Sequence, residues 1–98
     1  MSAGAAEIRF RRLRMRAWRR GTREMDLILG PFADARLETM TPEALDVFER
    51  VLDENDQDLY LWVTGQDTPP PPLAGLIADI GAHARTRLGP GSGPGGSI

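Results

Sequence analysis

The carboxylates that could bind a cation are concentrated in one stretch, at Asp53, Glu54, Asp56 and Asp58. Closely spaced oxygen ligands suit calcium, but a calcium-binding loop also needs a central glycine and a terminal bidentate glutamate. This stretch has neither of them. We therefore interpret it as a solvated acidic corner, in which Asp56 caps the helix that follows.

Other residue types that carry catalysis are scarce. The chain has no cysteine and a single histidine, His83, so it offers neither a thiolate nor a histidine-based metal centre. Glu24 and Asp26 lie two positions apart, where helical side chains do not face each other. His83 falls outside the apolar stripe of its segment and is expected to face solvent. We therefore expect a protein that is not an enzyme and that holds no metal.

Arginine is concentrated near the N-terminus, with eight residues between Arg9 and Arg23. Residues 1–36 hold nine arginines against four acidic residues, whereas residues 37–98 hold three against ten. Clustered arginine neutralises phosphates, so a nucleic-acid-binding helical module is one hypothesis. Against it stand an isoelectric point of about 5.3, the lack of a nucleic-acid-binding motif, and Trp18 as the one aromatic residue in the densest part. The alternative is that the arginines are solvated or pair with the acidic half.

Gly21 interrupts this charged run in the sequence RRGTRE. Inside a helix a glycine costs about 1 kcal/mol relative to alanine, which leaves two interpretations open. Gly21 either marks a bend or the start of a second helix, or it lets the backbone of another protein approach closely. In the second interpretation Arg20 and Glu24, four positions apart on one helical face, frame the contact with opposite charges.

The apolar periodicity predicts the first two helices. Residues 8–19 form the first, with imperfect spacing, and residues 25–32 form the second, with one clean apolar stripe. Gly30 and Pro31 are expected to kink or end the second helix, because proline has no N–H to donate and clashes with the preceding turn. A short irregular bend should follow.

Three further helices follow in the prediction. Thr41 is the expected N-cap of a third helix, with Pro42 at its first position. A short fourth helix begins at Asp56 and is closed by Gly65. Residues 69–72, four consecutive prolines, predict a polyproline II spacer before the last helix. The apolar positions of these three helices are Leu45, Phe48, Val51, Leu52, Leu59, Trp62, Val63, Leu73, Leu76, Ile77, Ile80, Ala84 and Leu88.

These elements predict an all-α protein, a compact five-helix bundle. Residues 1–6 are expected to be a flexible N-terminus, residues 7–88 a single helical domain, and residues 89–98, rich in Gly, Pro and Ser, a disordered tail. No apolar run approaches the roughly 20 residues that span a bilayer, so direct membrane insertion is not expected.

The string RRGTREMDLILGPFA, with DQDLYLWVTGQ further along, closely resembles the succinate dehydrogenase flavinylation factors, also called FAD assembly factors. That family has an RGxxE signature, which stands here as Arg20, Gly21, Thr22, Arg23 and Glu24. The resemblance covers roughly residues 9–88. Its second segment matches at Asp56, Asp58, Leu59, Trp62 and Gly65.

The resemblance implies a five-helix bundle that is not an enzyme, binds the flavoprotein subunit of succinate dehydrogenase, and promotes covalent attachment of FAD to a histidine of that subunit. It implies fumarate reductase as a further client. Partner contact is carried over to Arg20, Gly21 and Glu24, with Arg23, Asp26, Arg16 and Arg19 as weaker candidates.

FAD itself is expected to be attached to the partner and not to bind stably to this chain, which has no glycine-rich dinucleotide fingerprint. No nucleic-acid partner is expected. The free protein is expected to be a monomer. The short N-terminus, without a convincing targeting segment, favours the bacterial cytoplasm.

Overall fold

The helices follow the apolar pattern of the sequence in the computed structural model, which describes residues 4–88. In chain order they are α1 (Ala5–Trp18), α2 (Arg23–Arg36), the 3-10 helix η1 (Leu37–Thr39), α3 (Pro42–Leu52), α4 (Asp56–Val63) and α5 (Pro71–Leu88). The described residues contain no strand. The predicted all-α bundle with five α-helices is confirmed, while the predicted tail, residues 89–98, lies outside the described residues.

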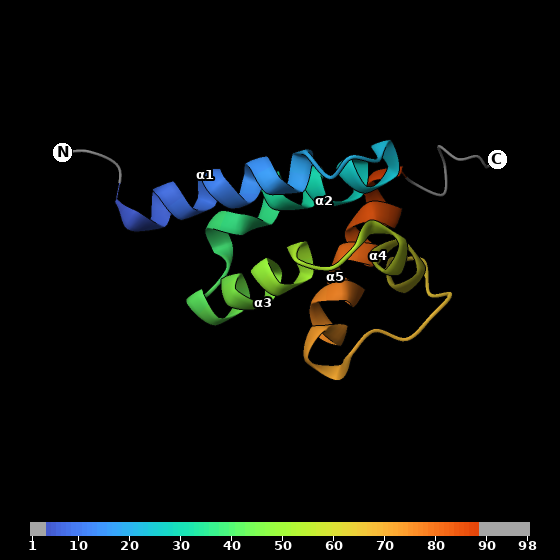
Figure 1. The fold of residues 1–98 in the computed structure, drawn as a ribbon. Helices are drawn as coiled ribbons and strands as arrows, with labels where there is room; N and C mark the ends of the chain where they lie inside the picture. The colour runs from blue at the N-terminus through green and yellow to red at the C-terminus, as the bar shows by residue number, and fades with distance from the viewer. Residues whose placement is uncertain (1–3, 89–98) are drawn as a thin grey trace.

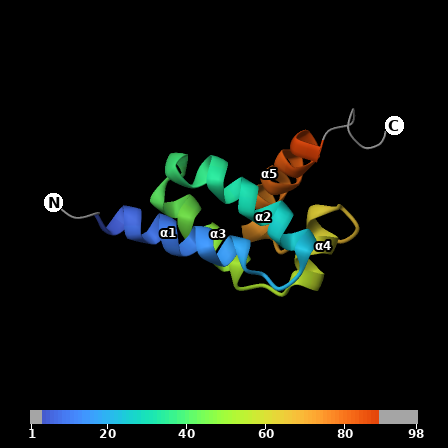
Figure 2. The ribbon, with the colours of Figure 1, turned by 90° about the horizontal axis from the view of Figure 1, so that it is seen from above.

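The helices form two groups that meet over a common core. α1 and α2 lie side by side, and α3 runs beneath them (Figure 1). α5 packs against α2, α3 and α4, and seen from above it crosses α2 (Figure 2). The connection between α1 and α2 lies at the same end of the molecule as α4 in both views (Figures 1 and 2).

α1 begins at Ala5, three residues before the predicted start and inside the segment expected to be flexible. Ala5 and Ala6 have the highest helix propensity of any residue, and the N–H of Ile8 donates to the carbonyl of Gly4 at 3.1 Å. The helix ends at Trp18, close to its predicted end.

α2 continues through Pro31 to Arg36, so the expected end of the helix at Gly30 and Pro31 is wrong. Proline removes one backbone hydrogen bond. Phe32 and Ala33, which lie beyond it, are fully buried, and the guanidinium carbon of Arg36 lies 5.3 Å from the centre of the Phe32 ring. Burial of these side chains, worth about 1.5–3 kcal/mol for a phenylalanine, offsets the lost bond.

Gly30 leaves room on α2 for the side chain of Trp18, the last residue of α1. A Cβ atom at residue 30 would lie only 2.3 Å from Cδ2 of Trp18, so the indole ring lies directly against the backbone of α2. The indole Nε1 donates to Asp34 Oδ2 at 3.2 Å. Any side chain at residue 30 would displace the indole ring of Trp18.

The predicted N-cap of α3 is confirmed, whereas the predicted N-cap of α4 is wrong. Thr41 Oγ1 accepts from the N–H of Ala44 at 3.1 Å, with Pro42 at the first helical position. At α4 the cap is Asn55, whose Oδ1 accepts from the N–H of Asp58 at 2.8 Å. The prediction of Asp56 as the cap is therefore wrong, which leaves its carboxylate available to another partner.

α5 begins at Pro71, so the predicted polyproline spacer is shortened to residues 69–70. Prolines are tolerated in the first turn of a helix because the N–H groups there have no helical acceptor. At the other end of this connection Gly65 closes α4 with a φ of +80°, as predicted from its position.

The core is contiguous and is built from all the helices. Its two largest side chains, Phe32 and Phe48, are fully buried with ring centres 5.9 Å apart. His83 is half-buried and presents its edge to Phe32, with ring centres 5.6 Å apart, so its expected exposure to solvent is wrong. The remaining buried apolar residues are Leu13, Ala17, Met25, Leu29, Ala33, Leu37, Leu45, Val51, Leu52, Leu59, Val63, Leu73, Ile77, Ile80 and Ala84.

Candidate partner-binding site

Gly21 lies in the short connection between α1 and α2 and has a φ of +98°. Residues other than glycine rarely adopt this backbone conformation. A Cβ atom there would meet nothing within 4 Å, so the glycine is required by the backbone and not by packing inside the chain. The interpretation of Gly21 as a bend between two helices is confirmed. The open space beside it leaves room for a partner.

The connection is held on both sides of Gly21 by hydrogen bonds to the first turn of α2. Thr22 caps α2, because its Oγ1 accepts from the N–H of Met25 at 3.4 Å. The N–H of Arg20 donates to Asp26 Oδ1 at 2.7 Å, which ties the connection to the first turn of α2. Asp26 is therefore a half-buried structural residue and not a free carboxylate.

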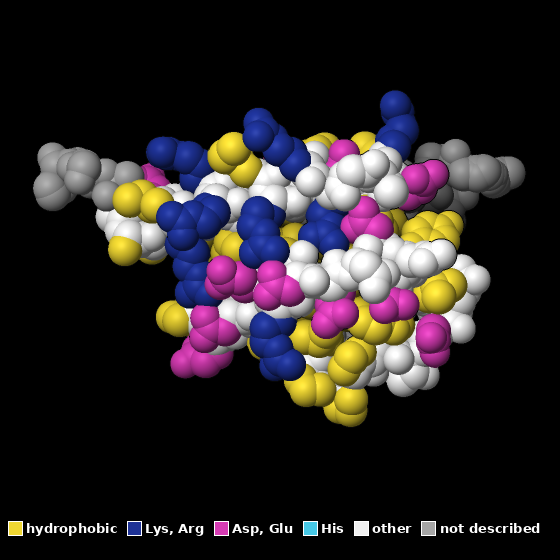
Figure 3. Space-filling model, in the orientation of Figure 1, with side chains coloured by type: hydrophobic (Ala, Val, Ile, Leu, Met, Phe, Trp, Pro, Cys, Tyr) yellow, Lys and Arg dark blue, Asp and Glu magenta, His cyan; other side chains and the backbone are white. Residues whose placement is uncertain are grey.

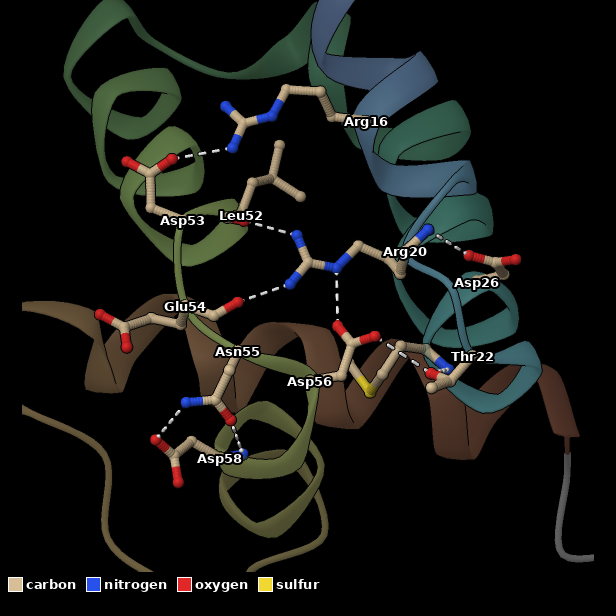
Figure 4. A network of polar contacts seen from close by, with 11 residues as sticks. Arg16, Arg20, Thr22, Asp26, Leu52, Asp53, Glu54, Asn55, Asp56 and Asp58 are labelled. Atoms are coloured by element: carbon tan, nitrogen blue, oxygen red, sulfur yellow. Dashed lines mark hydrogen bonds and ion pairs between the residues drawn. The ribbon is translucent and has the colours of Figure 1, made fainter.

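Arg20 points inward, toward the connection between α3 and α4, and its side chain is only 10% exposed (Figure 4). Its Nε donates to Asp56 Oδ1 at 2.8 Å. Nη1 donates to the carbonyl of Leu52 and Nη2 to the carbonyl of Glu54, both at 2.5 Å. A planar guanidinium with five N–H donors suits such a set of three acceptors, which a lysine could not satisfy in the same geometry.

Asp56 completes this network from α4. Its second oxygen, Oδ2, accepts from Thr22 Oγ1 at 3.2 Å, so one carboxylate binds both the residue before Gly21 and the residue after it. We call these residues, Arg20, Thr22 and Asp56 with the carbonyls of Leu52 and Glu54, the Arg20 network. The network therefore fixes the positions of the residues on either side of Gly21.

The predicted frame of Arg20 and Glu24 on one helical face is wrong. Arg20 precedes α2, and its side chain is withdrawn into the network, whereas Glu24 lies exposed in the first turn of α2. The cause is Gly21 itself, because its positive φ turns the chain between the two residues. Opposite charges therefore do not flank the glycine in the manner expected.

The other candidate contact residues divide into exposed and paired ones. Arg19 and Arg23 are exposed on either side of the turn. Arg16 is half-buried and its Nη2 lies 2.8 Å from Asp53 Oδ1. Arg19, Gly21, Arg23 and Glu24 are thus all exposed at or beside the connection between α1 and α2, and we call these four residues the glycine turn.

Three of the arginines of α1, Arg9, Arg14 and Arg16, pair with carboxylates of the acidic half of the chain, as one of the two interpretations predicted. Arg9 Nη2 lies 2.6 Å from Asp46 Oδ1 and 3.1 Å from Glu49 Oε1, on α3. The hydrogen bond with Asp46 raises the pKa of the Arg9 guanidinium above its ordinary value, against a smaller opposing effect of burial. Arg14 Nη2 lies 3.7 Å from Glu38 Oε2, and its Nε lies 3.2 Å from Asp34 Oδ1 on α2. These pairs use arginines that a phosphate-binding surface would need free.

The space-filling view shows the same division of charge. Most arginines lie over α1, and acidic side chains lie over α3 and over the end that holds α4 (Figure 3). Within residues 4–88 no group of three or more His, Cys, Asp or Glu side chains is arranged to hold a metal ion. No helix in that part of the chain is long and apolar enough to cross a membrane.

Fold and site together define a class: a small all-α protein with an exposed, charged glycine turn that one inward-facing arginine supports. The chain belongs to the family described as flavinator of succinate dehydrogenase, whose model matches residues 11–84. The matched segment includes both the glycine turn and the Arg20 network.

Individual relatives agree with this family. The chain is 41% identical over 69 residues to the FAD assembly factor SdhE of Acetobacter pasteurianus, covering 66% of this chain and 63% of that protein. It is 42% identical over 82 residues to the mitochondrial succinate dehydrogenase assembly factor 2 of Aspergillus flavus, covering 84% of this chain and 27% of that protein. The chain thus spans about a quarter of the length of this fungal relative.

Proposed function

We propose that the chain is an assembly factor that binds the flavoprotein subunit of succinate dehydrogenase and promotes covalent attachment of FAD to a histidine of that subunit. Membership of the flavinator family carries this proposal. The glycine turn supports it, because Gly21, Arg23 and Glu24 of the RGxxE signature are exposed while Arg20 holds the turn in place.

Within the signature we assign two different roles. Gly21, Arg23 and Glu24, with Arg19, are exposed and make direct contact with the partner. Arg20 acts from behind by holding the turn, as do Asp26, through its bond to the N–H of Arg20, and Arg16, through Asp53. The open space at Gly21 suits the close approach of a partner backbone.

The factor acts by positioning and not as an enzyme. FAD stays on the partner, which supplies both the accepting histidine and the flavin 8α-methyl group. Holding a mobile domain of the flavoprotein so that these two groups remain aligned raises the rate through proximity alone. We extend the proposal to fumarate reductase as a client, to a monomeric free protein, and to action in the bacterial cytoplasm.

Co-expression with a succinate dehydrogenase flavoprotein subunit tests this proposal. Flavin fluorescence of that subunit on a denaturing gel reports covalent attachment. We expect strong fluorescence with the wild type, background fluorescence with Gly21→Arg, and wild-type fluorescence with Gly65→Arg. Gly65 is the matched control, because it also has a positive φ, +80°, and open space around it.

Equal fluorescence with and without the wild-type factor would overturn the proposal for this client. Background fluorescence with both glycine variants would instead show that backbone strain, and not the glycine turn, accounts for the loss.

A further inference from the structure

Beside the glycine turn, a groove open to solvent runs between the first turn of α2 and α4. Thr22, Glu24 and Met25 form its α2 side. Asp56, Gln57, Asp58, Tyr60 and Leu61 form its α4 side. Its volume of about 710 Å³ is large enough for several side chains rather than for a single ion. We call it the α2–α4 groove, and the sequence alone gives no sign of it, since its two walls come from separate segments.

The groove carries negative charge. Glu24, Asp56 and Asp58 line it, and no arginine does. Asp56 is compensated by Arg20 at 2.8 Å. Glu24 has no ion pair within the described residues, and Asp58 accepts only from the neutral amide of Asn55, at 2.9 Å. Two uncompensated carboxylates therefore remain, and they favour a cationic side chain while disfavouring an anion such as the pyrophosphate of FAD.

The groove also has an apolar part. Met25 is buried at its base, Leu61 is half-buried, and Tyr60 is 42% exposed although it is a large aromatic residue. Exposed tyrosine is enriched at protein interfaces, because its ring buries much area with little loss of conformational entropy and its hydroxyl keeps a hydrogen-bond partner. A charged ligand alone would leave this surface uncovered.

The groove and the glycine turn are continuous. Thr22 lines the groove and directly follows Gly21, and Glu24 belongs to both surfaces. A partner backbone that crosses Gly21 therefore reaches the groove within two residues of this chain. The Arg20 network lies under both of them, so the turn and the α4 wall keep a fixed relative position (Figure 4).

We infer that the α2–α4 groove binds a segment of the flavoprotein subunit in which an arginine or lysine lies next to an apolar side chain. This inference rests on the proposed function and specifies the partner chemistry of its site. The basic group pairs with Glu24 and Asp58, and the apolar group covers Tyr60 and Leu61. The groove is thus a second part of the docking surface, supplied by α4 and not by the RGxxE signature.

The test measures the dissociation constant between the purified factor and the flavoprotein subunit at two salt concentrations. Asp58→Asn keeps the shape of the side chain and removes its charge. We expect it to weaken binding about three- to tenfold and to flatten the dependence on salt. Tyr60→Ala should weaken binding about fivefold or more while leaving the dependence on salt unchanged.

Asp79→Asn is the matched control, because Asp79 is exposed on α5 and does not line the groove. This substitution changes the net charge of the protein by the same amount as Asp58→Asn. It should bind as the wild type does. Thermal melts of all variants show whether each is folded at the temperature of the titration, and a Tyr60→Phe variant, which keeps the ring, should restore most of the affinity lost in Tyr60→Ala.

The outcomes separate the inference from the proposed function. If the wild type binds and Asp58→Asn, Tyr60→Ala and Asp79→Asn all have the same dissociation constant, the inference about the groove is overturned. The proposed function is then unaffected. Failure of the wild type to bind the subunit would overturn the proposed function, and the groove with it. A concentration-dependent dimer of the factor that Tyr60→Ala abolishes would show that a second copy fills the groove, which would also overturn the inference.

Discussion

Arg20 and Asp56 are 36 residues apart in the sequence, yet Arg20 Nε donates to Asp56 Oδ1 at 2.8 Å. The two side chains are only 10% and 18% exposed, and the same guanidinium also donates to the carbonyls of Leu52 and Glu54. Because these acceptors belong to the connection between α3 and α4, Arg20 determines where the glycine turn lies relative to α4. The arginine of the RGxxE signature is therefore a support for the glycine beside it.

The first prediction concerns that support. Arg20→Ala removes three donors from acceptors that are partly buried, and we expect the free energy of unfolding to fall by about 2–4 kcal/mol. Arg20→Lys should recover only part of this loss, because an ammonium group cannot reach the three acceptors in the same geometry. Urea denaturation measures both changes.

Arg11→Ala is the control for this prediction, since Arg11 is exposed on α1 and has no ion pair within the described residues. It should change the stability by less than about 0.5 kcal/mol. An Arg20→Ala variant as stable as this control would contradict the role of the network. A double-mutant cycle with Asp56→Asn then gives the energy of the Arg20–Asp56 pair alone.

The second prediction separates strain from contact at Gly21. Any L-residue at a φ of +98° is strained, so Gly21→Arg should lower the free energy of unfolding by about 1–3 kcal/mol. Gly65→Arg, at a φ of +80°, should lower it by a similar amount. Thermal melts monitored by circular dichroism measure both. A far larger loss at Gly21 than at Gly65 would mean that the turn is needed for folding itself, and its effect on flavin attachment could not be assigned to partner contact.

The third prediction tests the contact between α1 and α2. Gly30→Ala places a methyl group 2.3 Å from Trp18 Cδ2 and should displace the indole, lowering the stability by about 1–3 kcal/mol. Tryptophan fluorescence should shift to the red as the Trp18 ring, already 38% exposed, moves further into water. Gly75→Ala is the control, because a Cβ there meets nothing within 4 Å, and it should stabilise α5 by up to about 1 kcal/mol. Equal effects of the two alanines would contradict the close approach at Gly30.

The fourth prediction compares two aromatic residues of the bundle. Phe48 is fully buried against Phe32, so Phe48→Ala should cost about 3–5 kcal/mol of stability. Trp62 is only half-buried, and Trp62→Ala should therefore cost clearly less, in spite of its larger side chain. Urea denaturation measures the difference in the free energy of unfolding between the two variants. The comparison requires that this free energy depend on urea concentration with the same slope in both. A loss at Trp62 equal to or above that at Phe48 would contradict this account of the core.

The sequence by itself determined the features that depend on near neighbours. The apolar stripes of the helices, the cap at Thr41 with Pro42, and the turn at Gly65 all involve contacts within about one helical turn, where residue type and spacing decide the conformation. The RGxxE string and the segment around Trp62 also identified the family correctly, because both are read in order along the chain.

Tertiary structure alone decided what lies between separate segments. The sequence indicated that an arginine-rich part and an acidic part attract each other, but many pairings satisfy that attraction equally well. Only the packing of the helices brings Asp56 within hydrogen-bond distance of Arg20 and places the Trp18 ring against Gly30. The α2–α4 groove has the same origin, since its walls meet through packing. Such distances depend on how the whole core is filled, and no local pattern contains them.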